Sequence, residues 1–360
     1  MSNAVSDDEA LSLRRFVFPA LFVLALFVAL WMRRPDDPGA SQWAFTGDAF
    51  GTSYAVKVVP QEGGAEQAAI KAVIAAEIAL VNAQMSTYQD DSALSKLNAD
   101  GSTGPMPISS ELLEVMQEAQ RVHGLSGGAF DVTIGPLVNA WGFGPDLVQP
   151  PTDEALKTAK ARVGMDKVTL DATGMTVTRK ASGVYIDLSA IAKGYAVDRI
   201  GSAIEGLGHG RYLVEVGGEV RARGANRKGQ LWTVGVEHPD GGAQDVAERV
   251  PLKDHSIATS GNYRNSRLVD GKVITHILDA RTGEPVSHGL GSVSVVHPSC
   301  MTADALATAL YVLGADEGHA LAERLGVAAL FLTRPDATKP TERKTTKAYD
   351  AQDSAHQASP

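Results

Sequence analysis

A carboxylate and a hydroxyl lie four residues apart in a segment that the sequence predicts to be helical. They are Asp304 and Thr308, in the run Thr302-Ala-Asp-Ala-Leu-Ala-Thr308. Residues four apart share one face of a helix, so both oxygens would face the same ligand. Mg²⁺ takes few protein ligands and binds phosphate oxygens beside them, which makes this pair a candidate magnesium site. The same residues also fit a structural role, with Thr302 as the helix cap and Asp304 in the first turn.

A second segment, from Tyr185 to Asp198, predicts a strand over 184–188 that turns directly into a helix over 189–204. The backbone N–H groups at such a helix start suit an anion or a nucleotide. Lys193 would occupy the first helical turn, where a cation is electrostatically unfavourable. A phosphate nearby would explain the lysine; the alternative is a solvated surface side chain.

A third segment, residues 127–144, begins with paired glycines, which let a backbone approach a ligand closely. Phe130 and Trp141 in this segment could stack on a ring, although filling the core is the commoner role for such side chains. Tyr88, at the end of a predicted helix, is a further candidate for ring stacking.

A fourth segment combines Thr259-Ser-Gly-Asn-Tyr263 with Thr275-His-Ile-Leu-Asp-Ala-Arg-Thr-Gly283. His276 is expected on a strand next to a turn, as a catalytic base or as a structural histidine. The other histidines lack metal-binding spacing, and the single cysteine, Cys300, excludes an internal disulfide.

The pattern of apolar residues predicts one mixed α/β (α+β) domain over residues 43–333. Helices are expected at 66–84, 109–123, 153–162, 189–204, 302–313 and 316–325. Strands are expected at 54–59, 184–188, 212–216, 220–223, 232–237, 273–279, 292–296 and 327–332, with a hairpin over 168–178.

The two ends of the chain differ from this domain. Residues 16–32 form a 17-residue apolar run between two arginine pairs, which predicts an uncleaved transmembrane signal anchor. Residues 1–15 would then be cytoplasmic and residues 33–42 a linker. Residues 334–360 contain few apolar side chains and are expected to be disordered. The net charge of −9 argues against a nucleic-acid-binding protein.

Residues 47–332 resemble the ApbE family of FAD:protein FMN transferases. The resemblance rests on Asp187-Leu-Ser-Ala-Ile-Ala-Lys-Gly-Tyr-Ala-Val-Asp198, His276-Ile-Leu-Asp-Ala-Arg-Thr-Gly283 and the 302–308 run. It implies a periplasmic enzyme that takes FAD and Mg²⁺. The anchor predicted at 16–32, in place of the lipid anchor often seen in relatives, would hold it in the bacterial inner membrane. The enzyme would move the FMN half of FAD to a threonine of an acceptor protein and release AMP. Acceptors of this kind include subunits of sodium-pumping NADH:quinone reductase or Rnf-type complexes.

The resemblance also implies roles for individual residues. The magnesium ligands would be Asp304, Thr308 and the backbone carbonyls of Ala190 and Ala307. The FAD contacts would be Tyr88, Ala129, Phe130, Asp131, Asp187, Lys193, His276 and Ile277. Phe50 is a departure, because the family usually has methionine in the Phe50-Gly51-Thr52 position; it preserves an apolar contact with the flavin.

Splitting the pyrophosphate of FAD needs charge neutralisation, from Mg²⁺ and a positioned cation, and a proton acceptor for the target hydroxyl. His276 is the candidate base. Two other functions use the same residues: an FAD pyrophosphatase, in which water replaces the threonine, and a membrane-tethered flavin-binding protein without turnover.

Overall fold

An eight-stranded antiparallel sheet organises the computed structural model, which describes residues 41–143, 151–239, 245–261, 266–269, 272–333 and 340–357. In spatial order its strands are β1 (Trp43–Ala49), β2 (Thr52–Val58), β6 (Tyr212–Val216), β7 (Glu219–Arg223), β10 (Ser256–Gly261), β15 (Leu290–His297), β16 (Ala328–Thr333) and β17 (Glu342–Thr345). The predicted anchor at 16–32, the N-terminus before it and the linker up to residue 40 lie outside the described residues. The sheet belongs to one unit, Gln42–Pro360.

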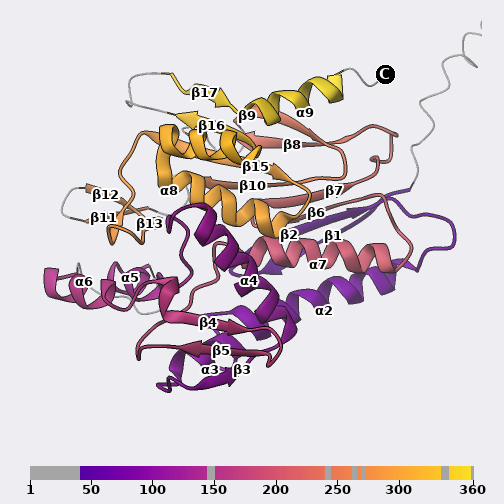
Figure 1. Cartoon of the computed structure of the whole chain (residues 1–360). Coiled ribbons are helices and arrows are strands. Elements are labelled where there is room, and N and C mark those ends of the chain that lie inside the picture. Colours follow the sequence, from indigo (N-terminus) through magenta and orange to yellow (C-terminus); the bar gives the residue numbers. More distant parts are fainter. Residues whose placement is uncertain are drawn as a thin grey trace, which may run out of the picture. The chain divides into compact units, whose positions relative to one another are not determined.

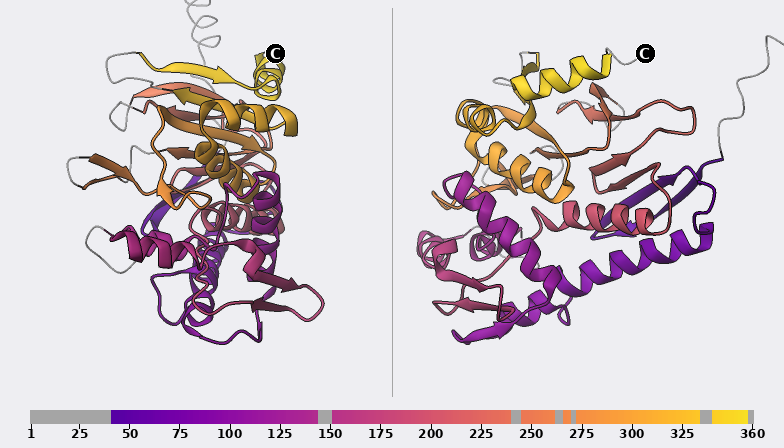
Figure 2. Two further views of the ribbon diagram at one scale, coloured as in Figure 1. Left: turned by 60° about the vertical axis from the view of Figure 1, so that its left-hand side comes forward. Right: turned by 45° about the vertical axis from the view of Figure 1, so that its right-hand side comes forward.

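Three long helices cover one face of the sheet (Figure 1). They are α2 (Gln67–Met85), α7 (Ala192–Gly206) and α8 (Cys300–Leu325). Figure 2 shows the same layering from two further directions. β16 is buried on both faces: Phe331 packs in the core beneath the helices, whereas Leu330 and Leu332 belong to a separate cluster. That second cluster is closed by the hairpin of β8 (Trp232–Glu237) and β9 (Val246–Leu252) and by α9 (Lys347–Gln357).

A smaller layer packs against the helices and shares their core. It contains α3 (Ala93–Ala99), α4 (Ser110–Leu125), the short helices α5 (Gly135–Ala140) and α6 (Asp153–Lys160), and the 3₁₀ turn η1 (Met165–Lys167). A three-stranded sheet in this layer has the order β3 (Pro105–Pro107), β5 (Thr176–Arg179), β4 (Val168–Asp171). Two small hairpins complete the chain: β11 (Ser266–Val269) with β12 (Lys272–Thr275), and β13 (Leu278–Asp279) with β14 (Glu284–Pro285). The predicted mixed α/β class and the 168–178 hairpin are confirmed.

The segment around Lys193 differs from its prediction. Residues 184–188 form no strand; Tyr185 makes only an isolated parallel bridge with Ile134. The helix begins at Ala192 rather than at 189, because residues 188–191 form a turn. In this turn the N–H groups of Ile191 and Ala192 both donate to the carbonyl of Leu188. Lys193 therefore still lies in the first turn.

The expectation of a disordered tail after residue 333 is wrong for residues 340–357. β17 extends the sheet beside β16, and α9 follows it. Thr346 and Tyr349 are 0% and 4% exposed. The hydroxyl of Thr346 donates to the carbonyl of Val327 and accepts from the N–H of Ala329. An existing sheet edge supplies backbone hydrogen bonds, so a mostly polar segment is ordered with few apolar side chains of its own.

One described helix, α2, is long and apolar enough to span a membrane by composition alone. Ile70, Ile74 and Ile78 bury one side of it in the core cluster beneath β2 and β6. The helix packs its buried face against the domain, and the residues outside that face are exposed or half-buried.

Candidate active site

Two buried carboxylates and one ammonium meet where α7, α8 and β7 converge. The ammonium nitrogen of Lys193 lies 2.7 Å from Oε1 of Glu219 and 3.9 Å from Oδ1 of Asp304. The other oxygen of Asp304, Oδ2, accepts a 3.0 Å hydrogen bond from the N–H of Gly194. In a regular helix that N–H would donate to the carbonyl of Ala190. In the described part of the chain no hydrogen-bond donor reaches this carbonyl, so the oxygen is available to a ligand.

Burial and charge act in opposite directions on these groups. Burial disfavours the charged form of Lys193, but the attraction of Asp304 and Glu219 outweighs it and raises the pKa of the lysine. Burial raises the pKa of Glu219 to about 7 and raises that of Asp304, although Lys193 opposes both shifts. Oε2 of Glu219 is buried and has no hydrogen-bond partner among the described residues. Two carboxylates and one ammonium give the site an excess of negative charge, which suits a cation.

The position of Asp304 depends on a close approach of α7 and α8. A Cβ atom at Gly194 would lie 2.4 Å from the carbonyl oxygen of Cys300 and 2.8 Å from Cβ of Asp304, so only glycine fits. Asp198, one turn further along α7, accepts hydrogen bonds from the N–H groups of Cys300 and Met301.

The helix cap predicted at Thr302 is wrong, because α8 begins at Cys300 and its N-cap is Ser299, whose hydroxyl accepts from the N–H of Thr302 at 3.2 Å. Asp198 adds an acceptor for two N–H groups of this first turn and so holds the helix that carries Asp304.

Thr308 continues the same face of α8. Its hydroxyl lies 2.9 Å from that of Ser260 on β10. Ala307 is fully buried within the helix. The described residues contain no cluster of three His, Cys, Asp or Glu side chains that could hold a metal. A cation here would have to combine one carboxylate with hydroxyl and carbonyl oxygens, a donor set that suits Mg²⁺.

The residues predicted to contact FAD in the 129–131 segment are mostly enclosed. Ala129 and Phe130 are each 2% exposed, so the Phe130 ring fills the core rather than stacking on a ligand. Asp131 accepts hydrogen bonds from the N–H and hydroxyl of Thr133 and from the N–H of Met165. These bonds hold a turn, and any FAD contact from Ala129 or Phe130 would come through the backbone.

Asp187 links this segment to the α7 start. Its N–H donates to the carbonyl of Val132 at 2.7 Å, and its carboxylate accepts from the N–H of Ser189. The structure therefore brings the 129–135 segment beside the turn that leads into Lys193. Tyr88, by contrast, lies just after α2 with 71% of its surface exposed. Among the described residues, no hydrogen bond or ion pair links Tyr88 to Asp304.

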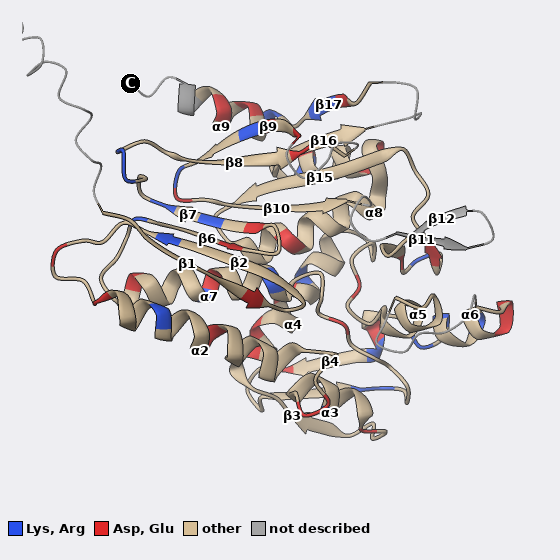
Figure 3. Ribbon diagram, turned by 180° about the vertical axis from the view of Figure 1, so that it is seen from behind, with Lys and Arg blue, Asp and Glu red and all other residues tan. Residues whose placement is uncertain are grey.

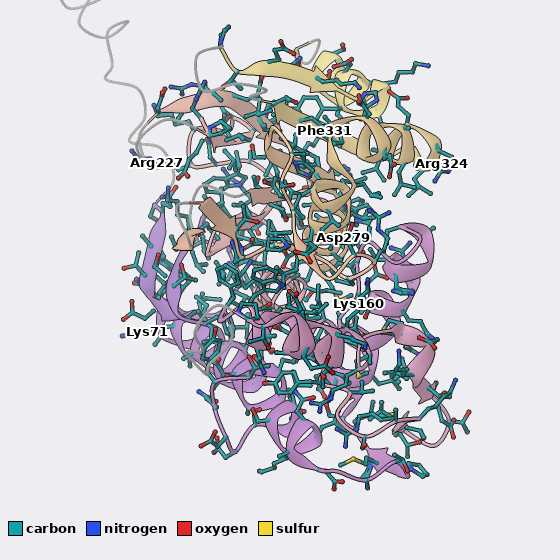
Figure 4. All side chains as sticks on the ribbon, turned by 90° about the vertical axis from the view of Figure 1, so that its left-hand side faces the viewer. Lys71, Lys160, Arg227, Asp279, Arg324 and Phe331 are labelled. Atoms are coloured by element: carbon teal, nitrogen blue, oxygen red, sulfur yellow. The ribbon has the colours of Figure 1, made fainter. Side chains whose placement is uncertain are left out.

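The 276–283 segment packs beside α5. His276 lies in a bend between β12 and β13, not on a continuous strand as predicted. Its ring makes an edge-to-face contact with the ring of Phe143, with 6.4 Å between the two ring centroids. Ile277 is 8% exposed. The Trp141 indole N–H donates to the carbonyl of Gly283 at 3.0 Å, which ties α5 to this loop. Figure 4 labels Lys160, the last residue of α6, and Asp279 of β13.

Phe50 is in the left-handed region, with φ of 53°, at the turn between β1 and β2. Its side chain packs against both the central core and the β1–β2 cluster. The residue after this turn, Thr52, approaches the site, because it lies against Gly217, which is next to Lys193.

Sequence reasoning missed three polar residues of the site: Glu219, Ser260 as a partner of Thr308, and Asp198 as an acceptor for the first N–H groups of α8. The available signal for Glu219 was the pair of glycines before it, Gly217-Gly218-Glu219, which marks a tight turn beside a strand.

Comparisons with known proteins establish the family of this chain. The ApbE family model matches residues 50–331, and the chain belongs to this family. The FAD:protein FMN transferase of Vibrio cholerae is 41% identical over 319 residues, which cover 88% of this chain and 94% of that protein. The Haemophilus influenzae protein of the same name is 40% identical, covering 81% and 87%.

Solved structures of family members share the fold. The flavin transferase ApbE from Vibrio cholerae has a TM-score of 0.79 at 38% identity, covering 87% of this chain and 99% of that chain. The apo form of the Pseudomonas stutzeri flavinyl transferase ApbE has a TM-score of 0.80 at 35% identity, covering 88% and 98%.

Proposed function

We propose that this protein transfers the FMN half of FAD to a threonine hydroxyl of an acceptor protein. The reaction breaks the phosphoanhydride bond of FAD, forms a phosphoester bond between the threonine oxygen and the FMN phosphorus, and releases AMP. Support comes from the names of the relatives in Vibrio cholerae and Haemophilus influenzae, which cover most of this chain. The acceptor is a protein with a flavinylation motif, such as a subunit of a sodium-pumping NADH:quinone reductase or Rnf-type complex.

The observation that carries the proposal is the buried group of Asp304, Glu219 and Lys193. Its excess negative charge and its oxygen donors suit Mg²⁺, which Asp304, Thr308 and the carbonyls of Ala190 and Ala307 would hold. The cation, when bound, would supply charge stabilisation at the phosphoryl oxygens, typically several kcal/mol.

The remaining steps belong to side chains of this protein. Lys193, charged and held in the first turn of α7, would orient the anionic pyrophosphate beside the helix start. At the N-terminus of α7, Ile191 offers no side-chain cap. The N–H groups of Ala192 and Gly194 are bonded to the Leu188 carbonyl and to Asp304, so among the described residues the N–H of Lys193 is left for the same task. His276 would take the proton of the attacking hydroxyl. The further FAD contacts would be Asp187, the backbone of Ala129 to Asp131, Phe50 and Tyr88.

Intact-mass spectrometry of an acceptor protein tests the proposal. We expect the acceptor to gain one FMN when it is incubated with this protein, FAD and Mg²⁺, and to stay unmodified when this protein is omitted. Release of free FMN and AMP with an unmodified acceptor would establish the pyrophosphatase instead. FAD binding without any product would establish a flavin-binding protein without turnover.

We also propose that residues 16–32 anchor the protein in the bacterial inner membrane and place the catalytic domain in the periplasm. The proposal rests on the apolar run and its arginine flanks. A reporter fused after residue 333 should be active only if it functions outside the cytoplasm. Activity of a cytoplasm-specific reporter at that position would refute the topology.

A further inference from the structure

Lys193 stands between two carboxylates at unequal distances. It forms a direct hydrogen-bonded ion pair with Oε1 of Glu219 at 2.7 Å, whereas Oδ1 of Asp304 is 3.9 Å away, beyond hydrogen-bonding distance. Because Gly194 occupies Oδ2 of Asp304, Oδ1 is the oxygen that remains for a cation. Lys193 is therefore the group closest to competing with a metal for Asp304.

A small movement of Lys193 would let its ammonium compete with a metal ion for Oδ1 of Asp304. The ammonium needs to approach Asp304 by only about 1 Å to form a charge-assisted hydrogen bond, whose usual length is about 2.8 Å. The lysine side chain is 29% exposed, so it is not locked by burial alone. What holds it back in the structure is its bond to Glu219.

We propose that Glu219 is a positioning residue that keeps Lys193 away from Asp304 and so leaves Oδ1 of Asp304 open to the divalent cation. The inference rests on the proposed function, since it concerns the metal that this function requires. Lys193 then remains charged and directed toward the substrate without neutralising the metal ligand.

The fold fixes Glu219 for this task. It is the first residue of β7, paired in register with Val216 of β6, and it is 3% exposed. The turn between these strands places Gly217 at φ +61°, and a Cβ atom there would lie 3.3 Å from Cδ of Lys193. The turn thus guides the stem of the lysine toward Glu219.

The second carboxylate oxygen of Glu219 is a separate observation in favour of this role. Oε2 is buried without a hydrogen-bond partner among the described residues. A glutamate that served only the fold would ordinarily have both oxygens satisfied. Retaining an uncompensated buried oxygen beside Asp304 is understandable if the negative charge of the pair is needed when a dication is present.

The test is metal affinity, measured as Mn²⁺ binding by electron paramagnetic resonance and as Mg²⁺ binding by calorimetry, on the full chain without FAD. Glu219→Gln keeps the shape but removes the charge that holds Lys193. Glu219→Asp keeps the charge but shortens its reach by one methylene. We expect both to weaken metal binding by about 10- to 100-fold, the equivalent of one charge-assisted hydrogen bond.

Removing the competitor should reverse the loss. We expect the double variant Glu219→Gln/Lys193→Met to bind metal within a few-fold of the wild type. If Glu219 acted only through net charge, Glu219→Asp would bind like the wild type, which would overturn the positioning role. Glu77→Gln is the matched control. It breaks a 2.8 Å ion pair with Arg199, which lies on the same helix as Lys193 but outside the site.

The outcomes separate this inference from the proposed function. If the wild type bound no metal, or if Asp304→Asn bound it equally well, the metal site of the proposed function would fail. If the wild type bound metal and Asp304→Asn did not, while both single variants at Glu219 bound like the wild type, only the positioning role would be overturned. Circular dichroism of each variant confirms that the fold is retained.

Discussion

Replacing Asp198 with asparagine should destabilise the protein through the first turn of α8. Oδ1 of Asp198 accepts from the guanidinium of Arg221 and the N–H of Cys300, each at 3.0 Å. Oδ2 accepts from the hydroxyl of Ser299 at 2.8 Å and the N–H of Met301 at 3.0 Å. In either orientation the introduced amide turns an NH₂ group toward two donors, so two of the four bonds are lost.

The cost follows from these contacts. Asp198 is 17% exposed, so solvent does little to replace the lost bonds. Loss of a helix cap costs about 1 kcal/mol, and leaving buried donors unsatisfied costs about 1–3 kcal/mol. Arg221 keeps its second partner, Glu205, at 3.1 Å, which limits the loss; Figure 3 shows the basic segments of β7 to which Arg221 belongs. We expect a total of about 2–4 kcal/mol.

Urea unfolding followed by far-UV circular dichroism measures this change. The control is Asp316→Asn, in the second half of α8, whose fully exposed carboxylate lies 3.7 Å from Lys344. Exposed ion pairs contribute little, so the control should unfold at the wild-type urea concentration. If Asp198→Asn also unfolded at the wild-type concentration, Asp198 would not stabilise the start of α8.

Three further changes probe other parts of the account. Gly194→Ala should destabilise by about 1–3 kcal/mol because its methyl would overlap the carbonyl of Cys300, whereas Gly206→Ala, with no atom within 4 Å, should be neutral or slightly stabilising in the same melting experiment. Tyr349→Ala should lower the melting temperature by removing a 4%-exposed ring, at about 3–5 kcal/mol; an unchanged melting temperature would mean that α9 adds nothing to the core. His276→Ala should reduce FMN transfer by about 10²- to 10⁴-fold and leave FAD affinity, measured by flavin fluorescence, unchanged. An unchanged rate would remove this histidine from the mechanism.

Local patterns were sufficient for much of the fold. The predicted helix over 66–84 corresponds to α2, and the strands at 212–216 and 232–237 match β6 and β8 at both ends. The two helices predicted over 302–325 are the halves of α8, which breaks at Gly314 with φ 80°. In these elements the apolar period, the caps and the glycines all agree, so neighbouring residues decide the structure.

Contacts between residues distant in sequence determine the elements that local patterns did not predict. Residues 184–188 look like a strand because Val184, Ile186 and Leu188 are buried, yet they face the core without a neighbouring strand. The order of the tail depends on the edge of β16, which no pattern within residues 340–357 reveals.

In the candidate site too, local spacing predicted some residues and missed others. The four-residue spacing of Asp304 and Thr308 placed them correctly on one helix. The unusual position of Lys193 pointed to a phosphate or to a solvated side chain, whereas in the structure its charged partner lies within the protein. That partner is a pair of carboxylates, one of them from Glu219 on a strand 26 residues along the chain. Pairing across a sheet and a helix start cannot be read from spacing, so Glu219 and the role of Asp198 at the start of α8 required the structure.

The most direct measurement is the rate of FMN transfer by Asp304→Asn as a function of Mg²⁺, with the melting temperature recorded on the same sample. Asp304 supplies the formal charge among the proposed ligands, and the amide keeps its shape. We expect at least about 100-fold slower transfer, partial recovery at high Mg²⁺, a smaller loss for Thr308→Ala, and loss of wild-type activity with chelator. A lowered melting temperature with a nearly unchanged rate and no response to metal would contradict the account, because Asp304 would then serve the fold and not the transfer.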